Sequence, residues 1–415
     1  MTTLVAPSLV HKLSSVVYEA DLAFRNIQSR NPNTSIARVT KLASKDFSKV
    51  LRETNIEFSS NNLGFMTSTS GMFQINLLSG FGFVAEGVAG RQGELILATR
   101  GTNFDHNKFD LATDANIGLA IGPRGNLVHR GFHKTFMGYR DQLIDFITDG
   151  GRRKHVGTVH CMGHSLGGAL ANLNASALRS AGYNVHLYTI GAPRVGQLSF
   201  AYDTTKIIPP SQICRVCNPC DPVPMVPVFP FMHASKGESE FLIRTSDKIG
   251  LEQHLLSSGY ARMSSLNSWS DLAIPTPLDI SNQGDLNASL QKVGGGTMFS
   301  GSALQIISNA LTQLLKLAGL VALSSLQCTL SNIFTVVDVL AEALAKVAHM
   351  SILVSEKIKS IVSSLLGFLG RGFVAVKELS YSFLHWVLDM FAREMSSRAR
   401  LAMDRAMSAG GRPRL

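Results

Sequence analysis

Residues 158–174, TVHCMGHSLGGALANLN, place a serine, Ser165, at the centre of the pattern Gly-x-Ser-x-Gly. The apolar run before it, 156–162, has the character of a buried strand, and the small residues after it, 169–178, favour a helix. A serine on a sharp turn from strand to helix points its hydroxyl into a cleft, close to the backbone amides that open the helix. Glycines on either side let strand and helix approach closely. The stretch therefore predicts a nucleophilic serine.

The composition is that of an apolar and basic chain. Of its 415 residues, 45% are hydrophobic and only 16% are charged, and the formal net charge is +10. This length is enough for one large α/β domain and a second unit. The basic excess is denser after residue 298, which suits an anionic membrane surface better than nucleic acid. The sequence has neither zinc-finger spacing nor an aromatic–basic RNA-binding motif, so we expect no nucleic-acid partner.

Cysteine usage does not indicate a disulfide scaffold, because five cysteines in so long a chain do not form such a framework. Cys214, Cys217 and Cys220 have a spacing that could suggest a metal site. No second pair follows, however, and residues 213–217 resemble a buried strand, so we expect neither a metal nor a cofactor. The N-terminus lacks the pattern of a secretory signal. We therefore expect synthesis in the cytoplasm, with any export through a specialised secretion system.

The order of elements predicts an α/β domain with a mainly parallel sheet. Helical patterns occupy residues 1–60. Short apolar runs, separated by helical or turn segments, then follow at 81–88, 94–99, 156–162, 185–190 and 212–217. Prolines and glycines interrupt residues 275–297, which we interpret as a linker. The predicted organisation is thus an α/β domain over 1–274, a linker over 275–297 and a further region over 298–415.

The C-terminal region, 298–415, is predicted to be all-α. Apolar residues between Ile333 and Val347 follow helical spacing, with charged residues on another face. Residues 317–337 form a charge-free run long enough to span a bilayer, although its polar side chains make it a poor span. A soluble helical bundle and a region inserted in or lying on a membrane are both compatible with this pattern.

A nucleophilic serine needs a base and an acid that orients the base. In α/β folds with such a serine, the acid and then the histidine follow it along the chain. Asp221 is the best candidate acid, because it comes just after the strand over 212–217, where ligand-facing loops of a parallel sheet emerge. His233 and His254 both follow Asp221 within the first domain. Spacing alone does not choose between them.

The oxyanion that forms during ester cleavage needs hydrogen-bond donors from two parts of the chain. Leu166 directly follows the nucleophile and offers its backbone N–H. Thr102 lies in the loop after the strand over 94–99 and offers both an amide and a hydroxyl. We expect these two residues to form the oxyanion hole.

Together these motifs resemble the class 3, or fungal-type, lipases of the α/β-hydrolase fold. The resemblance covers roughly residues 80–262, in the family's order and with family-like spacing. The matching segments are Arg100-Gly101-Thr102, 110–114, 128–132, 163–171, 188–196 and Asp221-Pro222-Val223-Pro224. The resemblance implies Ser165 as nucleophile, Asp221 as acid, and Thr102 and Leu166 as oxyanion hole. It implies His254 as base, since the family's histidine commonly precedes a tyrosine by a few residues, as His254 precedes Tyr260.

The chain also departs from the family's pattern. The interval from Asp221 to His254 is short, which keeps His233 open as an alternative base. Leu111 stands where the family has a tryptophan, and residues 103–114 are largely polar where an apolar lid is expected. We therefore expect substrate access to be controlled elsewhere, with the helical tail as the candidate.

The sequence thus predicts a serine carboxylic ester hydrolase acting on lipids, of the lipase or phospholipase A type. Phospholipid is favoured over triacylglycerol because the tail is basic and apolar, and residues 298–415 are expected to bind a membrane surface. The combination resembles a bacterial phospholipase effector. Two alternatives are a membrane-disrupting protein whose tail carries the activity, and a hydrolase-fold binding module without catalysis.

Overall fold

The computed structural model describes most of the first 274 residues and the end of the C-terminal region. The described residues are 4–54, 58–70, 77–88, 90–101, 119–149, 156–227, 231–235, 239–246, 248–274, 337–349, 352–371, 376 and 378–410. Several predicted features lie outside them: Thr102 and the segment 103–114, the linker 275–297, and residues 298–336.

A seven-stranded mixed sheet forms the centre of the fold, in the order β1-β2-β3-β6-β7-β9-β11. The first three strands pair antiparallel and the remaining pairs are parallel. The strand bounds are β1 Phe58–Ser70, β2 Leu77–Gly87, β3 Glu94–Thr99, β6 Thr158–His164, β7 Asn184–Ile190, β9 Ile213–Cys217 and β11 Glu240–Leu242. A smaller sheet lies beside it, with β4 Leu119–Ile121, β5 Leu127–His129, β8 Gly196–Gln197 and β10 Phe231–Met232.

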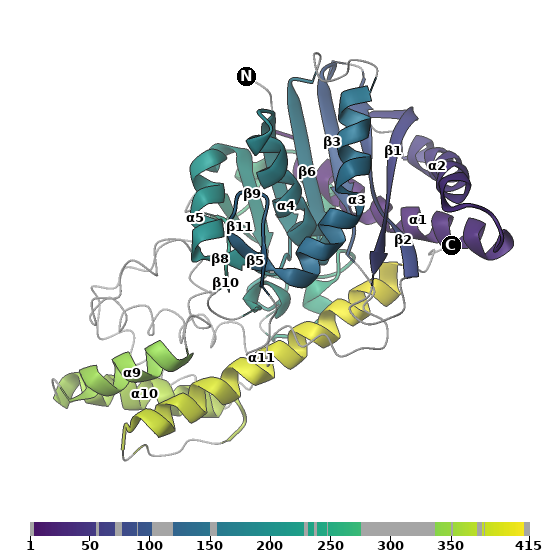
Figure 1. The fold of residues 1–415 in the computed structure, drawn as a ribbon. Helices are drawn as coiled ribbons and strands as arrows, with labels where there is room; N and C mark the ends of the chain where they lie inside the picture. Colours follow the sequence, from purple (N-terminus) through teal and green to yellow (C-terminus); the bar gives the residue numbers. More distant parts are fainter. Residues whose placement is uncertain are drawn as a thin grey trace.

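Helices cover both faces of the large sheet (Figure 1). On one face lie α3 (Arg130–Thr148) and α4 (Leu166–Ser180), and on the other α1 (Pro7–Arg30) and α2 (Ile36–Glu53). Successive side chains of β3 point to opposite faces of the sheet. Leu95 and Leu97 pack in the core under α3 and α4, whereas Ile96 and Ala98 pack in the core under α1 and α2. This alternation explains why the buried central strands are continuously apolar in sequence.

Shorter elements complete the domain and connect its strands to the site. They are α5 Leu198–Ile207 and the 3₁₀ turns η2 Pro210–Gln212, η3 Val223–Met225, η5 Leu251–His254, η6 Ala261–Ser265 and η7 Trp269–Asp271.

The architecture confirms the predicted α/β-hydrolase fold with a mainly parallel sheet. All five predicted strands are present, with bounds shifted by a few residues, or in the case of 81–88 extended back to residue 77. Strand β1 was not predicted from the sequence, because this edge strand is rich in serine, threonine and asparagine and lacks apolar alternation. Strand β11 was not predicted either, because it has only three residues.

The described part of the C-terminal region is helical, as predicted. It consists of α9 Val337–Ala348, α10 Ile352–Phe368 and α11 Tyr381–Gly410. The three helices share an apolar cluster with Cys220, Met225 and Ile249 of the α/β domain. Among the helices of the described ranges, none is long and apolar enough to cross a membrane.

Candidate active site

Ser165 lies on a sharp turn between β6 and α4, as its sequence pattern predicts. Its backbone has φ 58° and ψ −132°, and it is the only non-glycine residue with positive φ among those described. Ser165 N–H donates to the carbonyl of Ile190 at 3.0 Å, which fixes the turn against β7. A Cβ on Gly167 would lie 2.1 Å from the carbonyl oxygen of Thr99. Glycine is therefore required at this position, because the start of α4 passes so close to the end of β3.

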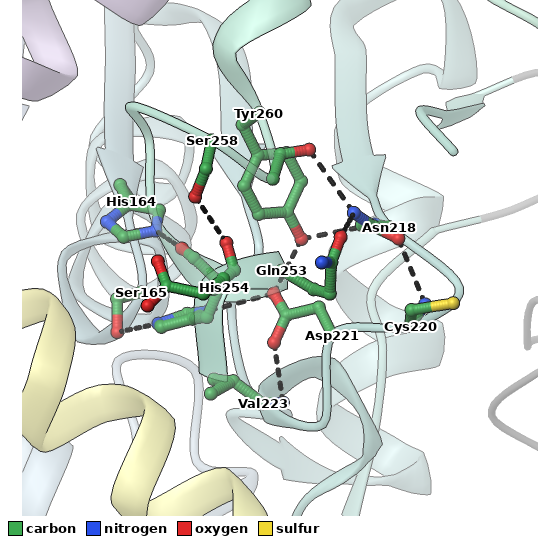
Figure 2. A network of polar contacts seen from close by, with 12 residues as sticks. His164, Ser165, Asn218, Cys220, Asp221, Val223, Gln253, His254, Ser258 and Tyr260 are labelled. Atoms are coloured by element: carbon green, nitrogen blue, oxygen red, sulfur yellow. Dashed lines mark hydrogen bonds and ion pairs between the residues drawn. The ribbon is translucent and has the colours of Figure 1, made fainter. Parts of the chain in front are cut away.

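Ser165, His254 and Asp221 form a continuous hydrogen-bonded chain (Figure 2). The Ser165 hydroxyl lies 2.8 Å from Nε2 of His254, and Nδ1 of the same ring lies 2.8 Å from Oδ2 of Asp221. All three side chains are buried. The arrangement has the geometry of a nucleophile, a base and an acid that orients the base.

Two further donors hold the Asp221 carboxylate. The backbone N–H of Val223 donates to Oδ1 at 2.9 Å, and the hydroxyl of Tyr260 donates to Oδ2 at 2.6 Å. Burial first, and then the Asp221 charge, raise the pKa of Tyr260 well above 10.0, so its hydroxyl stays protonated. The same hydroxyl accepts the backbone N–H of Asn218 at 3.1 Å. Tyr260 thus couples the acid to the end of β9.

His164, the neighbour of the nucleophile, supports the backbone of the base. Its Nε2 lies 2.7 Å from the carbonyl oxygen of His254, and its Nδ1 lies 3.1 Å from the hydroxyl of Tyr18 on α1. Burial, followed by the nearby His254, lowers the pKa of His164 well below 6.5. A neutral His164 therefore donates to the carbonyl through Nε2 and accepts from Tyr18 through Nδ1.

His233 is not part of this chain of hydrogen bonds. Its Nε2 lies 2.6 Å from the carbonyl oxygen of Pro224, and burial lowers its pKa well below 6.5. Of the two histidines that spacing left open, the geometry favours His254 as the base.

Leu166 is the first residue of α4, so its backbone N–H has no partner within the helix. The predicted second donor, Thr102, lies outside the described residues. The strand end before it is anchored by Arg100, whose guanidinium pairs with Asp21 at 3.0 Å and lies 5.1 Å from the centre of the Phe81 ring. Arg100 Nε also donates to the carbonyl of Gly80 at 2.5 Å. This buried arginine fixes the backbone at the end of β3, two residues before Thr102 in the sequence.

The three clustered cysteines do not converge on a metal. Cys214 and Cys217 lie on β9, and the Cys220 thiol lies 3.0 Å from the carbonyl oxygen of Ser246. Burial raises the pKa of the Cys214 thiol. In the described part of the chain, no group of three or more histidine, cysteine, aspartate or glutamate side chains could hold a metal ion.

Residues 96–231 match the family model described as Lipase (class 3). The matched region, which is less than half of the chain, is similar to the class 3 lipases. The matched region contains Ser165, Leu166 and Asp221 and ends before His254. The match supports lipid ester hydrolysis as the activity of this region. Residues 4–274 of the described chain, which contain the matched region, are called the lipase domain below.

Many solved structures are similar to this chain, and three of them are described here. A mono- and diacylglycerol lipase from Aspergillus oryzae is 23% identical, with 50% of this chain and 67% of that chain covered and a TM-score of 0.35. A mutant of MDLA from Penicillium cyclopium is 22% identical, covering 67% and 87%, with a TM-score of 0.39. The native Rhizomucor miehei lipase propeptide complex is 23% identical, covering 57% of this chain and 68% of that chain, with a TM-score of 0.36.

The residues that hold the three central side chains in place were not predicted from the sequence. Tyr18 and Asn218 act through buried hydrogen bonds with His164 and Tyr260. Arg100 was noted only as part of a motif, and its ion pair with Asp21 was not foreseen. Tyr260 was noted only as a marker for the histidine. A signal for Arg100 was available, since a basic residue at the end of an apolar strand must find a buried partner.

Proposed function

We propose that the lipase domain cleaves lipid esters with Ser165 as nucleophile, His254 as general base and Asp221 as the acid that orients the base. The observation that carries this proposal is the pair of 2.8 Å contacts that His254 makes, one with Ser165 and one with Asp221. A base within hydrogen-bond reach of the nucleophile, and itself oriented by a carboxylate, is the arrangement that nucleophilic catalysis requires.

In the first half of the reaction, His254 Nε2 takes the hydroxyl proton as Ser165 Oγ attacks the ester carbonyl carbon. The negative charge that develops on the carbonyl oxygen is stabilised by the N–H of Leu166 and by Thr102. Asp221 stabilises the imidazolium through Nδ1–H. The imidazolium then gives its proton to the departing alkoxide, which leaves as an alcohol and an acyl-enzyme on Ser165.

In the second half, water attacks the acyl carbonyl while His254 accepts one of its protons. The second tetrahedral intermediate collapses, the proton returns to Ser165 Oγ, and the free fatty acid departs. Every proton transfer passes through one imidazole nitrogen, so the step rates depend on the His254 ring keeping its orientation. Two contacts supply that orientation: the His254 carbonyl accepts from His164, and His254 Nδ1 contacts Asp221.

We further propose phospholipid as the preferred substrate and the helical region as the part that binds the membrane. Support comes from the basic, apolar character of residues 298–415, which matches an anionic lipid surface. On α11, Trp386 and Leu401 are about half exposed, and Arg393 and Arg405 are exposed as well. Aromatic and basic side chains together favour the interface between lipid and water. Export through a specialised secretion system stays a prediction.

The test is ester hydrolysis by wild type, Ser165→Ala and Ser176→Ala on three substrates: phospholipid vesicles, a triacylglycerol emulsion and a soluble short-chain ester. Ser176 is a matched control, because it is buried on α4 and its hydroxyl has no hydrogen-bond partner among the described residues. We expect Ser165→Ala to lose activity by several orders of magnitude on every substrate, and Ser176→Ala to retain it. Activity that survives in Ser165→Ala would contradict the proposed nucleophile.

The same variants distinguish each of the two alternative functions from ester hydrolysis. A membrane-disrupting protein would release dye from vesicles equally well as wild type and as Ser165→Ala. A binding module without catalysis would bind vesicles but release no fatty acid from any substrate. Fatty-acid release that precedes dye release and disappears in Ser165→Ala would support the hydrolase.

A further inference from the structure

We propose that helix α2 carries a contact surface for membranes, a row of exposed cations that binds anionic lipid headgroups. This cationic row consists of Arg38, Lys41, Lys45, Lys49 and Arg52. The inference rests on the proposed function in one respect, because a lipid substrate makes a lipid surface the expected anionic partner. It places a membrane contact on the lipase domain itself, on a different surface from the C-terminal helices.

The cationic row occupies one face of α2. Its members are separated by three, four, four and three residues, a spacing that stacks successive side chains on one side of a helix. The opposite side of α2 is apolar and buried in the domain, through Val39, Ala43, Phe47 and Leu51. From Arg38 to Arg52 the row is about 21 Å long, from a rise of roughly 1.5 Å per residue. Because α2 lies at the outer edge of the domain (Figure 1), the row faces outwards as one straight strip.

Other helices of the chain arrange their exposed charges differently. In the C-terminal helices, basic side chains form ion pairs with an acid four residues earlier: Glu342 with Lys346, Asp389 with Arg393, and Glu394 with Arg398. Such pairs stabilise a helix, whereas like charges four residues apart destabilise it. These C-terminal pairs therefore have the arrangement expected of a surface that only meets water.

The cationic row has the opposite arrangement. Lys41, Lys45 and Lys49 repeat every four residues, so that each lysine has another lysine one turn away. Lys49 pairs with Asp46 at 2.9 Å. Arg38, Lys41 and Lys45 form no ion pair with any carboxylate of the residues that the structure describes. Water alone leaves this repulsion in place, whereas an anionic partner relieves it.

A membrane of anionic lipids is the partner that fits this row. Its headgroups form a broad negative surface, and each Lys or Arg brought near it strengthens binding roughly fivefold. Leu42, next to Lys41, is 37% exposed and supplies an apolar side chain that can enter the headgroup layer. Nucleic acid also attracts cations, but the sequence has no aromatic–basic motif on which bases would stack. The ester chemistry supported for this domain likewise favours lipid.

Helix α1 connects the cationic row with the helical region that is proposed to bind membranes. α11 contacts α1, and α1 packs against α2. In Figure 1, α2 and the C-terminal end of α11 lie on the same side of the molecule. Two membrane contacts on one chain strengthen overall binding, because the second forms when the chain is already at the surface. The row would thus keep the lipase domain close to its substrate.

The test is binding of full-length protein to vesicles of phosphatidylglycerol and to vesicles of phosphatidylcholine, measured by flotation. The row variant combines Arg38→Gln, Lys41→Gln and Lys45→Gln, which removes three charges and keeps good helix formers. We expect it to bind phosphatidylglycerol about 100-fold more weakly than wild type, with a shallower dependence on salt. Neutral phosphatidylcholine should bind both proteins weakly and to the same extent.

The matched control combines Lys134→Gln, Arg140→Gln and Lys206→Gln. These cations lie on α3 and α5, away from α2, and their removal changes the net charge by the same amount. We expect the control to stay within about threefold of wild type, because charges far from the lipid surface are screened. Urea unfolding checks the fold of the row variant, which should be at least as stable as wild type, since repulsion within α2 has been removed.

The row is refuted if the folded row variant binds phosphatidylglycerol as tightly as wild type, or if the control loses as much affinity. Equal binding of wild type to the two lipids would also overturn it. A preference of wild type for a short DNA duplex over phosphatidylglycerol at the same salt would make the row a nucleic-acid surface instead. If wild type hydrolyses no soluble ester but binds vesicles as expected, the proposed nucleophile fails and the row stands.

Discussion

Replacing Tyr260 with phenylalanine tests whether the hydroxyl that holds Asp221 matters for both stability and catalysis. The change keeps the ring and removes one oxygen, which donates to Asp221 Oδ2 at 2.6 Å and accepts the N–H of Asn218 at 3.1 Å. Losing a hydrogen bond to a charged acceptor and stranding a buried N–H should together cost about 3 kcal/mol in the free energy of unfolding.

The same change should lower kcat by about 10- to 100-fold, because a carboxylate held by fewer donors orients His254 less well. Asp221 keeps the Val223 N–H and the His254 contact, so activity should fall without being abolished. The measurements are urea unfolding followed by circular dichroism, and kcat on a soluble short-chain ester.

Tyr139→Phe is the matched control for this prediction. Tyr139 is also fully buried, and its hydroxyl donates to Oδ1 of Asn174 at 3.0 Å, away from the three central residues. It should lose about 1 kcal/mol of stability with kcat unchanged. If Tyr260→Phe keeps wild-type kcat, or if both variants lose kcat equally, the positioning argument is wrong.

Three further predictions concern the acid, a buried histidine and the tail. Asp221→Asn should fold normally and lose about four orders of magnitude in kcat on a soluble ester, because the wrong tautomer of His254 is then favoured; a loss under tenfold would contradict the assignment. Burial lowers the pKa of His129 from 6.5 to about 4, so the unfolded chain binds more protons between these values. Stability should therefore fall by roughly 3 kcal/mol as the pH drops through this window, and urea unfolding of His129→Gln should show a flatter pH dependence. Arg405→Glu should lower the free energy of unfolding by up to about 1 kcal/mol in urea unfolding, because it replaces the half-exposed ion pair with Glu252 by two like charges, and adding Glu252→Arg should restore the loss; a loss that is not restored would exclude the ion pair as its cause.

The fold was predictable because its central strands are buried on both faces and therefore read as continuous apolar runs. The strand–turn–helix around Ser165 was predictable for a related reason, since close approach demands glycine and the helix demands small residues. Asp221 followed from its place at the end of β9, a position that topology makes functional. These are local signals, each contained within about ten residues.

The remaining features depend on contacts between distant parts of the chain, which local patterns do not encode. Spacing could not choose between His233 and His254, because both follow Asp221 and only the path of the loop brings one of them to Ser165. The packing of α11 against η3 and η5 likewise depends on contacts between distant parts of the chain. The sequence predicts that this region is helical, but not the surface against which its helices pack.

A hydrogen bond between residues far apart in the sequence affects how the chain folds during its synthesis. Trp269 Nε1 donates to the carbonyl of Val5 at 2.8 Å across a sequence separation of 264 residues, and Val5 N–H donates to the Tyr188 hydroxyl. At roughly 5–20 residues per second, α1 waits about 15 to 50 s on the ribosome before its final partner exists. During that interval its apolar face has no complete sheet to cover, so we expect nascent chains to need chaperones that hold the N-terminal helices.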